Sequence, residues 1–409
     1  MKTPQSPAFC PNPGCCCHRI DKQDRKGRVP RSRPSGSVDR SDDEQTTTLT
    51  PWYDRKGFYT SGVGGRVQRY RCRFCGTGFS DQTFSLDYFA KRRVSYRRIE
   101  EMICATASLR DISRVLHISL GTVGNRISRL ARQAMACHAT YLLSLLPAEP
   151  FVTDGFESFV YSQYFPNNIN LLLTSDSQLL LAATYCTIRR KGRMTKAQRR
   201  RREQLEQLYR PPGSTIRHAF GDLMDEAMPL VKRQYEATGC PVELRSDEKR
   251  EYRIALAAHP FYRALRLKGK LLHRTVSSKA TRTVSNPLFA VNYFDRELRK
   301  DLANHVRETV CFARNVNAAM ERFWIYAVHH NLVKRYRERQ PRRDTSTHAT
   351  VAGIPRRLTR SLRLHYFTRR AFFSRTRGLP GSFVRLWRRQ LETPLHPNGG
   401  YSLPRYAVR

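Results

Sequence analysis

Two closely spaced pairs of cysteines constrain this chain more than any other feature of its sequence. Cys72 and Cys75 lie in "RYRCRFCGTGFS", and Cys10 and Cys15 lie in "CPNPGC" near the start. Such spacings, in turns rich in proline and glycine, are typical of the two halves of a tetrahedral zinc site. A redox pair, the other interpretation of Cys72 and Cys75, lacks its usual strand-then-helix context. The sequence therefore predicts a zinc ribbon over residues 8–85, with these four cysteines as the zinc ligands.

The first cysteine pair is crowded by further metal-binding side chains. Cys16, Cys17 and His18 follow Cys15 directly, so the choice of ligands on that side stays open. Residues 19–50 are polar and charged, a composition that favours disorder. We expect them to form a disordered insertion between the two halves of the zinc ribbon.

The charge of the chain points to a polyanionic partner. The 409 residues include 74 Lys and Arg against 34 Asp and Glu, a formal net charge of +40. Nucleic acid is the first candidate for such a partner and an anionic membrane the second. No run approaches the ~18 apolar residues of a membrane span, and the N-terminus lacks the apolar core of a signal peptide. We therefore expect a cytosolic protein with reduced cysteines.

The segment "LRDISRVLHISLGTVGNRISRLAR" has the pattern of a helix-turn-helix. Its apolar residues recur at helical spacing, which predicts a first helix over Leu109–Leu116 and a turn around His117–Ile118. Ser119 then caps a second helix. An ordinary helical hairpin is the alternative. If the segment binds DNA, the face opposite the apolar stripe offers side chains suited to base edges and phosphates, namely Thr122, Asn125, Arg126 and Arg129.

Two aspartates follow apolar strands in the part of the chain after Glu149. "EPFVTD" ends at Asp154 and "CPVELRSD" ends at Asp247, with two further strands expected over Asn170–Thr174 and Gln178–Ile188. An aspartate at the end of a strand often serves only as the N-cap of the next helix. In so basic a chain, however, carboxylates at strand ends also suggest oxygen ligands for Mg²⁺. From spacing alone, capping and metal binding remain equally open.

The order of these segments resembles that of insertion-sequence DDE transposases. The resemblance rests on "CPNPGC", "RYRCRFCGTGFS", "VTDGFESF" and "RETVCFARN" and covers about residues 8–340. It implies an α/β fold: an RNase H-like catalytic domain over residues 148–340, preceded by the zinc ribbon and an all-α helix-turn-helix domain over residues 90–145. It also implies strand cleavage and strand transfer at the ends of an insertion sequence, with Mg²⁺ or Mn²⁺ as cofactor beside the structural Zn²⁺.

The resemblance further implies a triad of metal-binding acids. Asp154 and Asp247 match its first two members, and the third lies on a later helix. "NYFDRELRK" makes Asp295 the first choice, although its separation of 48 residues from Asp247 is longer than is usual in that family and the family more often has Glu there. Glu308 is the alternative third acid. Two other acids also compete for the role, Glu297 and Glu321.

Basic segments beyond these motifs have two interpretations each. Arg189–Arg210 is either a DNA clamp or a solvated helix. Arg299 and Lys300 are candidates to hold the scissile strand, and His305 either joins them or packs in the core. Residues 341–409 are expected to form a basic C-terminal tail that contacts DNA or is weakly ordered.

The partners follow from the same resemblance. It implies double-stranded DNA at the element ends and the target, a homo-oligomer assembled on DNA, association with the nucleoid in the cytoplasm, and no membrane. The competing hypothesis is a non-catalytic zinc-ribbon and helix-turn-helix DNA-binding regulator with a decayed nuclease fold. The two differ in whether the carboxylates of Asp154 and Asp247 come together with a third acid.

Overall fold

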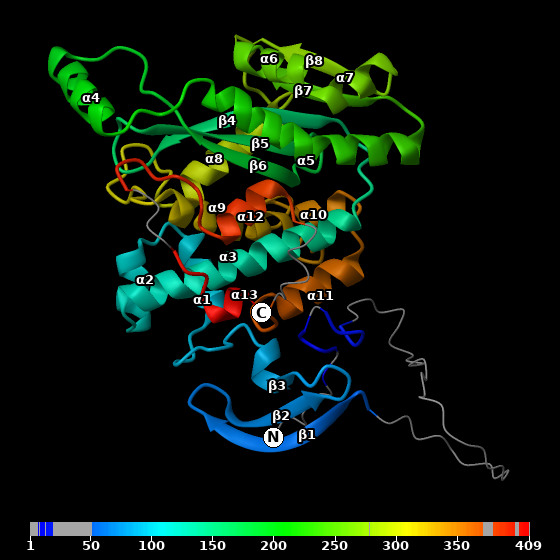
Figure 1. The fold of residues 1–409 in the computed structure, drawn as a ribbon. Helices are drawn as coiled ribbons and strands as arrows, with labels where there is room; N and C mark the ends of the chain where they lie inside the picture. Colours follow the sequence, from blue (N-terminus) through cyan, green and yellow to red (C-terminus); the bar gives the residue numbers. More distant parts are fainter. Residues whose placement is uncertain are drawn as a thin grey trace. The chain divides into compact units, whose positions relative to one another are not determined.

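The computed structural model describes two units of the chain (Figure 1). The residues described are 7, 9–12, 14–18, 51–277, 279–370, 379–396 and 401–408. Unit 1 comprises Met1–Arg93 with the short segments Phe372–Ser374 and Pro404–Arg409, and unit 2 comprises Val94–Ala371 and Arg375–Leu403. The insertion expected at 19–50 lies outside the described residues. Among the described helices, none is long and apolar enough to cross a membrane.

Unit 1 is built on a small antiparallel sheet. Its strands, in the order β1-β2-β3, are β1 (Tyr53–Ser61), β2 (Gly65–Cys72) and β3 (Gly78–Ser80), followed by a 3-10 helix, η2 (Asp81–Phe84). A short helix, α13 (Arg405–Val408), is also assigned to this unit.

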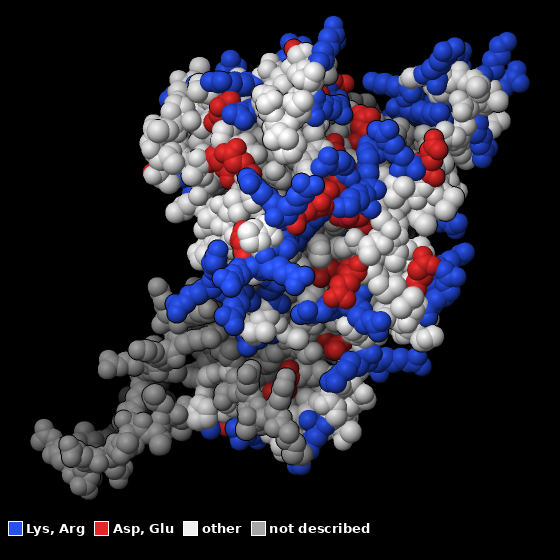
Figure 2. Space-filling view, turned by 180° about the vertical axis from the view of Figure 1, so that it is seen from behind, with Lys and Arg blue, Asp and Glu red and all other residues white. Residues whose placement is uncertain are grey.

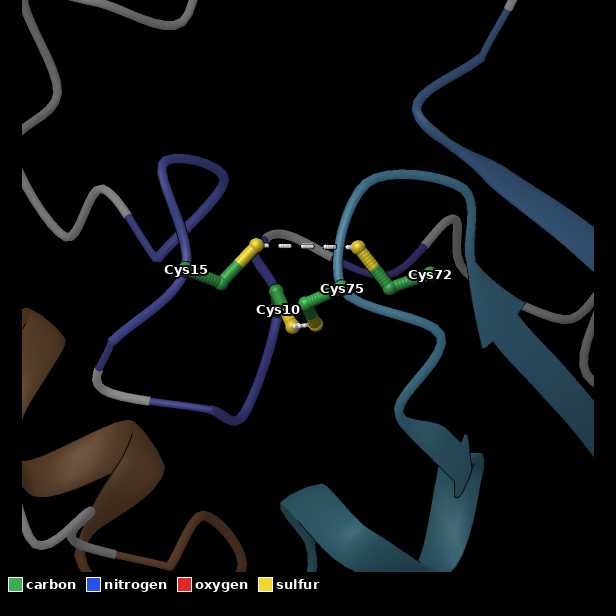
Figure 3. A group of neighbouring side chains, drawn as sticks. All are labelled: Cys10, Cys15, Cys72 and Cys75. Carbon is green, nitrogen blue, oxygen red and sulfur yellow. Dashed lines mark hydrogen bonds between the residues drawn. The ribbon is translucent and has the colours of Figure 1, made fainter.

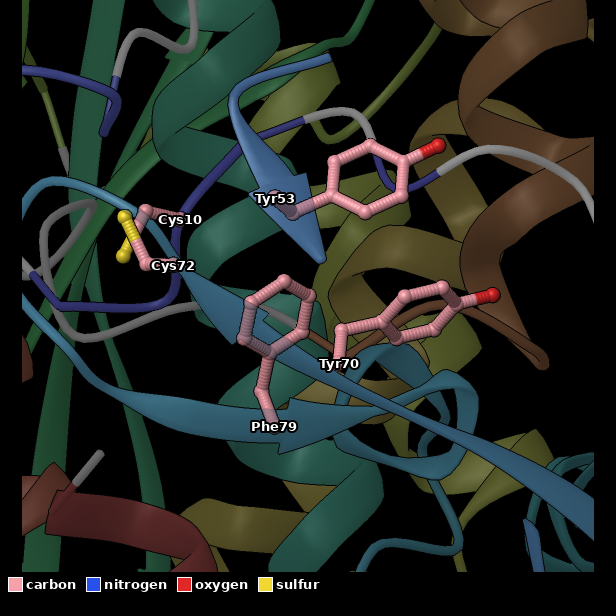
Figure 4. Close-up of a cluster of buried hydrophobic side chains, with 5 residues drawn as sticks. All are labelled: Cys10, Tyr53, Tyr70, Cys72 and Phe79. Carbon is pink, nitrogen blue, oxygen red and sulfur yellow. The ribbon is translucent and has the colours of Figure 1, made fainter. Parts of the chain in front are cut away.

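The core of unit 1 is a cluster of three rings beside two cysteines. Tyr70 makes an edge contact with Tyr53 at 5.2 Å and stacks on Phe79 at 5.3 Å, measured between ring centroids. Cys10 and Cys72 are buried against these rings (Figure 4). A core of this size gives little stability by itself, so a cross-link or a metal is expected to support it.

Unit 2 opens with three helices: α1 (Tyr96–Ile103), α2 (Leu109–Leu116) and α3 (Leu120–Leu143). Ser119 caps α3 by accepting a hydrogen bond from the backbone N–H of Thr122 at 3.2 Å. Between α2 and α3, His117 adopts a left-handed conformation with φ 49°. The predicted bounds of α2, the turn and the Ser119 cap are all confirmed.

A mixed five-stranded sheet follows, with the order β6-β5-β4-β7-β8. Its strands are β4 (Phe151–Phe159), β5 (Pro166–Thr174), β6 (Leu180–Thr187), β7 (Val242–Asp247) and β8 (Leu271–Val276). β4 and β6 run antiparallel to β5, whereas β7 is parallel to both β4 and β8. The predicted α/β class is therefore correct at this level.

The helices of unit 2 cover both faces of the sheet (Figure 1). On one face, the hydroxyl of Thr184 on β6 donates to the carbonyl of Ala219 on α5 (Thr215–Thr238) at 2.7 Å. On the other, Phe156 of β4 lies beneath Arg299 of α8 (Phe289–Asp301). The other helices of this part of the chain are α4 (Lys196–Leu208), α6 (Arg250–Ala258), α7 (Pro260–Leu267) and α9 (Val316–Leu332).

Residues beyond 340, expected to form a tail, supply helices to unit 2. These are α10 (His348–Val351), α11 (Arg356–Tyr366) and α12 (Gly381–Trp387). Phe383 makes an edge contact with Trp324 of α9 at 4.4 Å between ring centroids. The guanidinium of Arg132 on α3 donates to the carbonyl of Trp387 at 2.7 Å. α12 is therefore packed against the helices of unit 2 rather than extended as a tail.

Candidate metal centres

Four cysteine thiols from two distant segments meet in unit 1 (Figure 3). The Sγ atoms of Cys10 and Cys75 lie 3.6 Å apart, and those of Cys15 and Cys72 lie 3.7 Å apart. All four sulfur atoms lie within 4.8 Å of one another, and none is in a disulfide. Tetrahedral Zn–S bonds of about 2.3 Å would hold sulfur atoms about 3.8 Å apart. The four cysteines that the sequence predicted as one site could therefore hold a metal such as zinc.

The residues that crowd the first cysteine pair have other contacts. His18 Nδ1 lies 2.5 Å from the carbonyl oxygen of Cys10, so its ring contacts the backbone. The backbone N–H of Cys17 donates to Cys15 Sγ at 3.4 Å, a contact that stabilises a thiolate. Cys15, Cys16 and Cys17 also form a group of three within 4.8 Å. Because that group offers only three ligands and shares Cys15, the four-cysteine set is the better tetrahedral site.

Asp154 and Asp247 lie side by side on neighbouring parallel strands. The pairing of β4 with β7 extends to Thr153 opposite Ser246, and each aspartate is the next residue of its strand. Because side chains alternate along a strand, the two carboxylates lie on the same face of the sheet. Asp247 ends β7 as predicted. The prediction that Asp154 ends its strand is wrong, because β4 continues to Phe159 in register with β5.

Asp295, in the middle of α8, lies close enough to Asp154 to sense its charge. Burial, followed by the negative charge of Asp154, raises the pKa of Asp295 well above its ordinary value. Burial and then the charge of Asp247 likewise raise the pKa of Asp154 to about 6. In the described part of the chain, only cysteine groups bring three ligand atoms within 4.8 Å of one another. The carboxylates of the three acids are thus farther apart than the thiols of the cysteine site, and their negative charges repel one another.

Asp154, Asp247 and Asp295, called the acid cluster below, have side chains of the type that binds divalent cations. The Oδ1 atom of Asp295 is buried and has no hydrogen-bond partner among the described atoms. Backbone N–H groups orient the other two acids: Gly155 donates to Asp154 at 2.7 Å and Lys249 to Asp247 at 2.9 Å. Carboxylate oxygens are the preferred ligands of Mg²⁺, and a cation would relieve the repulsion among them.

The competing acids lie elsewhere or are already paired. Glu297 forms an ion pair with Lys334. Glu321 accepts a hydrogen bond from Ser128 at 2.9 Å inside the helical core. Glu308, the alternative third acid, is exposed on a loop with φ 55°. Asp295 is the acid whose pKa is raised by the charge of Asp154, which places it near that carboxylate.

Three cations surround the acid cluster, and the sequence singled out only one of them. Arg299 donates to the carbonyl of Glu157 at 3.1 Å, and its charge lowers the pKa of Asp295 against the effect of burial. Lys249 and Arg282 were missed, although both lower the pKa of Asp154. The position of Lys249, two residues after Asp247, was a usable signal. Lys300, the other candidate, pairs instead with Glu297 and Glu338.

His305 matches the core alternative. Its Nδ1 atom lies 3.0 Å from the hydroxyl of Ser158, and its ring meets that of Phe156 edge-on at 5.0 Å. Burial lowers the pKa of His305 to about 3, so the side chain is neutral at physiological pH.

The candidate DNA-binding residues of α3 differ in exposure. Asn125 is exposed and Thr122 is half-buried, but Arg126 and Arg129 are each only 4% exposed. Both guanidinium groups donate to Asn125 Oδ1, at 3.1 and 3.0 Å. The expectation that these arginines lie on an exposed face is wrong, because α3 is buried around most of its circumference and not only along its apolar stripe.

No protein-family model matches the chain, and no curated protein is significantly similar to it.

Proposed function

We propose that this protein is a metal-dependent enzyme that cleaves and joins DNA strands, and within that class an insertion-sequence DDE transposase. The observation that carries the proposal is the arrangement of the acid cluster. Two aspartates occupy matching positions of adjacent parallel strands, and a third, Asp295, comes from a helix on the same face. Buried acids that raise one another's pKa are costly to a fold, which favours a functional reason for them.

The strand order supports an RNase H-like catalytic domain. The first three strands of the sheet, β4, β5 and β6, form an antiparallel meander, and β7 and β8 add in parallel beside β4. In this arrangement β4 is central and carries Asp154, while the adjacent β7 carries Asp247. The order and directions are those expected from the resemblance to DDE transposases.

Under this proposal, Asp154, Asp247 and Asp295 would hold Mg²⁺ or Mn²⁺. A cation bound there would act as a Lewis acid on the scissile phosphate and on the attacking water or 3′ hydroxyl. The backbone N–H bonds from Gly155 and Lys249 keep two of the carboxylates in fixed positions. Arg299, fixed above the ring of Phe156 at 4.7 Å, would orient a non-bridging phosphate oxygen.

The rest of the chain would supply DNA binding. The net charge of +40 favours binding to phosphates, and Figure 2 shows Lys and Arg side chains crowding the projecting part of unit 2 that contains α4. The cysteine site would stabilise a zinc ribbon, and α2 and α3 would form the helix-turn-helix. Double-stranded DNA at the element ends, a homo-oligomer on that DNA and a nucleoid location belong to the same proposal.

A cleavage assay tests the proposal. The substrate is a donor plasmid that carries the gene with its own flanking DNA, incubated with Mg²⁺, with Mn²⁺ or with chelator. We expect cleavage by the parent, and a loss of at least about 100-fold in Asp154→Asn and Asp247→Asn, since each removes a charged metal ligand. Asp176→Asn, an exposed turn residue, is the matched control and is expected to cleave like the parent.

DNA binding measured on the same preparations separates the two hypotheses. Both Asn variants at the acid cluster are expected to bind DNA as the parent does, because phosphate contacts come from Lys and Arg. A parent that binds the flanking DNA but never cleaves it would support the non-catalytic regulator. Cleavage that survives in either variant would remove that acid from the metal site.

A further inference from the structure

A cationic cavity of about 680 Å³ opens on unit 2 beside the acid cluster. Four segments line it: the end of β4, the chain after β6, the start of α5 and the start of α6. Its basic side chains are Arg189, Arg190, Lys191, Arg210 and Lys249, against two acids, Glu157 and Glu251. The lining therefore has an excess of positive charge.

Three of these cations form no ion pair among the described residues, although Arg210 lies close enough to Glu206 for its charge to lower the pKa of that carboxyl. Arg189 pairs with Glu206 at 2.7 Å, and Lys249 lies 3.6 Å from Glu157. No ion pair of the described chain involves Arg190, Lys191 or Arg210. Cations without an ion pair are common on the open surface of so basic a chain. Three of them that line the same cavity instead favour the binding of an anion there.

Arg190 is held in position within this cavity. Its guanidinium lies over the ring of Tyr164 at 4.9 Å from the centroid. One terminal nitrogen, Nη1, is buried and has no hydrogen-bond partner in the described structure. A buried guanidinium N–H without an acceptor is costly, and a phosphate oxygen would satisfy it.

The start of α5 adds a second source of positive potential. Ser214, at the N-cap, has φ 60° and makes no side-chain capping bond to this 24-residue helix. Thr215 and Ile216, in the first turn, line the cavity. The free N–H groups of a helix start favour an anion, so they reinforce the charge of the three cations.

The cavity lies close to the acid cluster, although none of the three acids lines it. Glu157 and Ser158 line it and follow Asp154 by three and four residues on β4, about 10–13 Å along the strand. Lys249 lines the cavity and also follows Asp247 by two residues. At about 3.4 Å per nucleotide of stacked strand, this distance corresponds to about three or four nucleotides.

We propose that this cavity binds the sugar–phosphate backbone of the DNA strand that continues from the phosphate held at the acid cluster. The inference rests on the proposed function and adds to it the path of one strand and the side chains that hold it. Arg190, Lys191 and Arg210 contact successive phosphates, and the first turn of α5 contacts one of them.

The test compares two triple variants with equal loss of charge. The cavity variant is R190Q/K191Q/R210Q. The control is R253Q/R263Q/K268Q, three exposed residues of unit 2 outside the lining of the cavity. The probes are a 5′-fluorescein oligothymidylate of about 20 nucleotides and a random duplex of about 30 base pairs, lengths chosen to exceed the cavity path. Fluorescence anisotropy gives the binding constant at increasing NaCl concentrations.

We expect the logarithmic salt dependence of oligothymidylate binding to become shallower by about 2 in the cavity variant, since three lost contacts contribute about 0.7 each. The control is expected to keep the slope of the parent. If the cavity variant does not fold, Lys191→Gln alone, at an exposed position, is expected to lower the slope by about 0.7. Equal slopes in parent and cavity variant, or an equal change in the control, would overturn the cavity site.

The plasmid assay keeps this inference separate from the proposed function. A parent that never cleaves its donor plasmid, while the cavity variant alone loses salt dependence, contradicts the transposase and leaves only the binding of a phosphate backbone in the cavity supported. A parent that cleaves, with unchanged slopes in the cavity variant, contradicts only the strand path. A parent that binds neither probe at 50 mM NaCl overturns both.

Discussion

Asp154 of β4 and Asp247 of β7 lie next to each other on parallel strands and face the same side of the sheet. Their charges repel, which contributes with burial to the pKa of about 6 for Asp154. In the absence of a cation the fold therefore bears an electrostatic cost at this point. Such a cost is typical of sites whose residues serve binding or catalysis rather than stability.

Removing one charge from the acid cluster should stabilise the metal-free protein. Asp295 has a pKa raised by burial and by Asp154, so its ionised form is disfavoured in the fold. Asp295→Asn keeps the shape and removes that cost, and we expect its melting temperature in chelator to rise by a few degrees. Mg²⁺ should raise the melting temperature of the parent but not of the variant. Calorimetry checks both; a lower melting temperature in chelator would contradict the repulsion.

The third acid can be identified by the same cleavage assay that tests Asp154. We expect Asp295→Asn to lose at least about 100-fold in cleavage rate, as expected for a lost metal ligand. Glu308→Gln, an exposed carboxylate on a loop, should stay within a few-fold of the parent. If only the Glu308 variant lost activity, Glu308 and not Asp295 would be the third acid.

Local signals in the sequence predicted local structure well. The Ser119 cap and the apolar spacing of α2 gave correct helix bounds, because capping and periodicity act over a few neighbouring residues. Strand bounds near the acid cluster were less accurate: β5 begins at Pro166 rather than at the predicted Asn170, and β6 spans Leu180–Thr187 rather than Gln178–Ile188. Strand ends depend on pairing with distant segments, which a single sequence does not reveal.

Features that depend on tertiary packing were not predicted from the sequence. β8 was not predicted, because its residues alternate poorly between buried and exposed at the edge of the sheet. Arg126 and Arg129 looked like surface residues, but Asn125 binds both of them as they lie buried. Long basic side chains can bury their apolar stems wherever a polar partner meets the head group, so charge alone does not establish exposure.

Loss of one cysteine of the four-thiol site should remove its metal and unfold unit 1. We expect one zinc per full-length chain by elemental analysis, and none in Cys72→Ser, with the near-ultraviolet circular dichroism of Tyr53, Tyr70 and Phe79 reduced. Cys240→Ser, at an exposed position in unit 2, should retain the zinc. Zinc lost from Cys16→Ser but kept in Cys72→Ser would instead favour the adjacent group of three cysteines.

The stability of unit 2 should fall as the pH drops below about 6.5, because two stacked histidines are buried in neutral form. The rings of His330 and His348 lie 3.9 Å apart. His330 Nε2 donates to the carbonyl of Gln178 at 3.0 Å, and His348 Nδ1 donates to that of Ser177 at 2.8 Å, so both histidines hold the turn between β5 and β6. Burial lowers the pKa of His348 to about 4 and that of His330 well below its ordinary value.

The direction of the pH effect follows from these pKa values. Above the unfolded pKa of about 6.5 the histidines are neutral in both states and stability does not depend on them. Below it the unfolded chain binds protons that the fold excludes, so stability is lost progressively until the folded pKa of about 4 for His348. His348 alone should lower the free energy of unfolding by about 2 kcal/mol at pH 5 relative to pH 7.5.

The variant His348→Asn tests this effect, because its amide can replace the Nδ1 donor but does not titrate. Over the same pH range it should lose about 2 kcal/mol less stability than the parent when unfolding is measured by urea titration. His117→Asn, exposed between α2 and α3, should follow the pH dependence of the parent. Parallel curves for the parent and His348→Asn would show that His348 binds protons equally in the folded and unfolded chain, which contradicts the prediction.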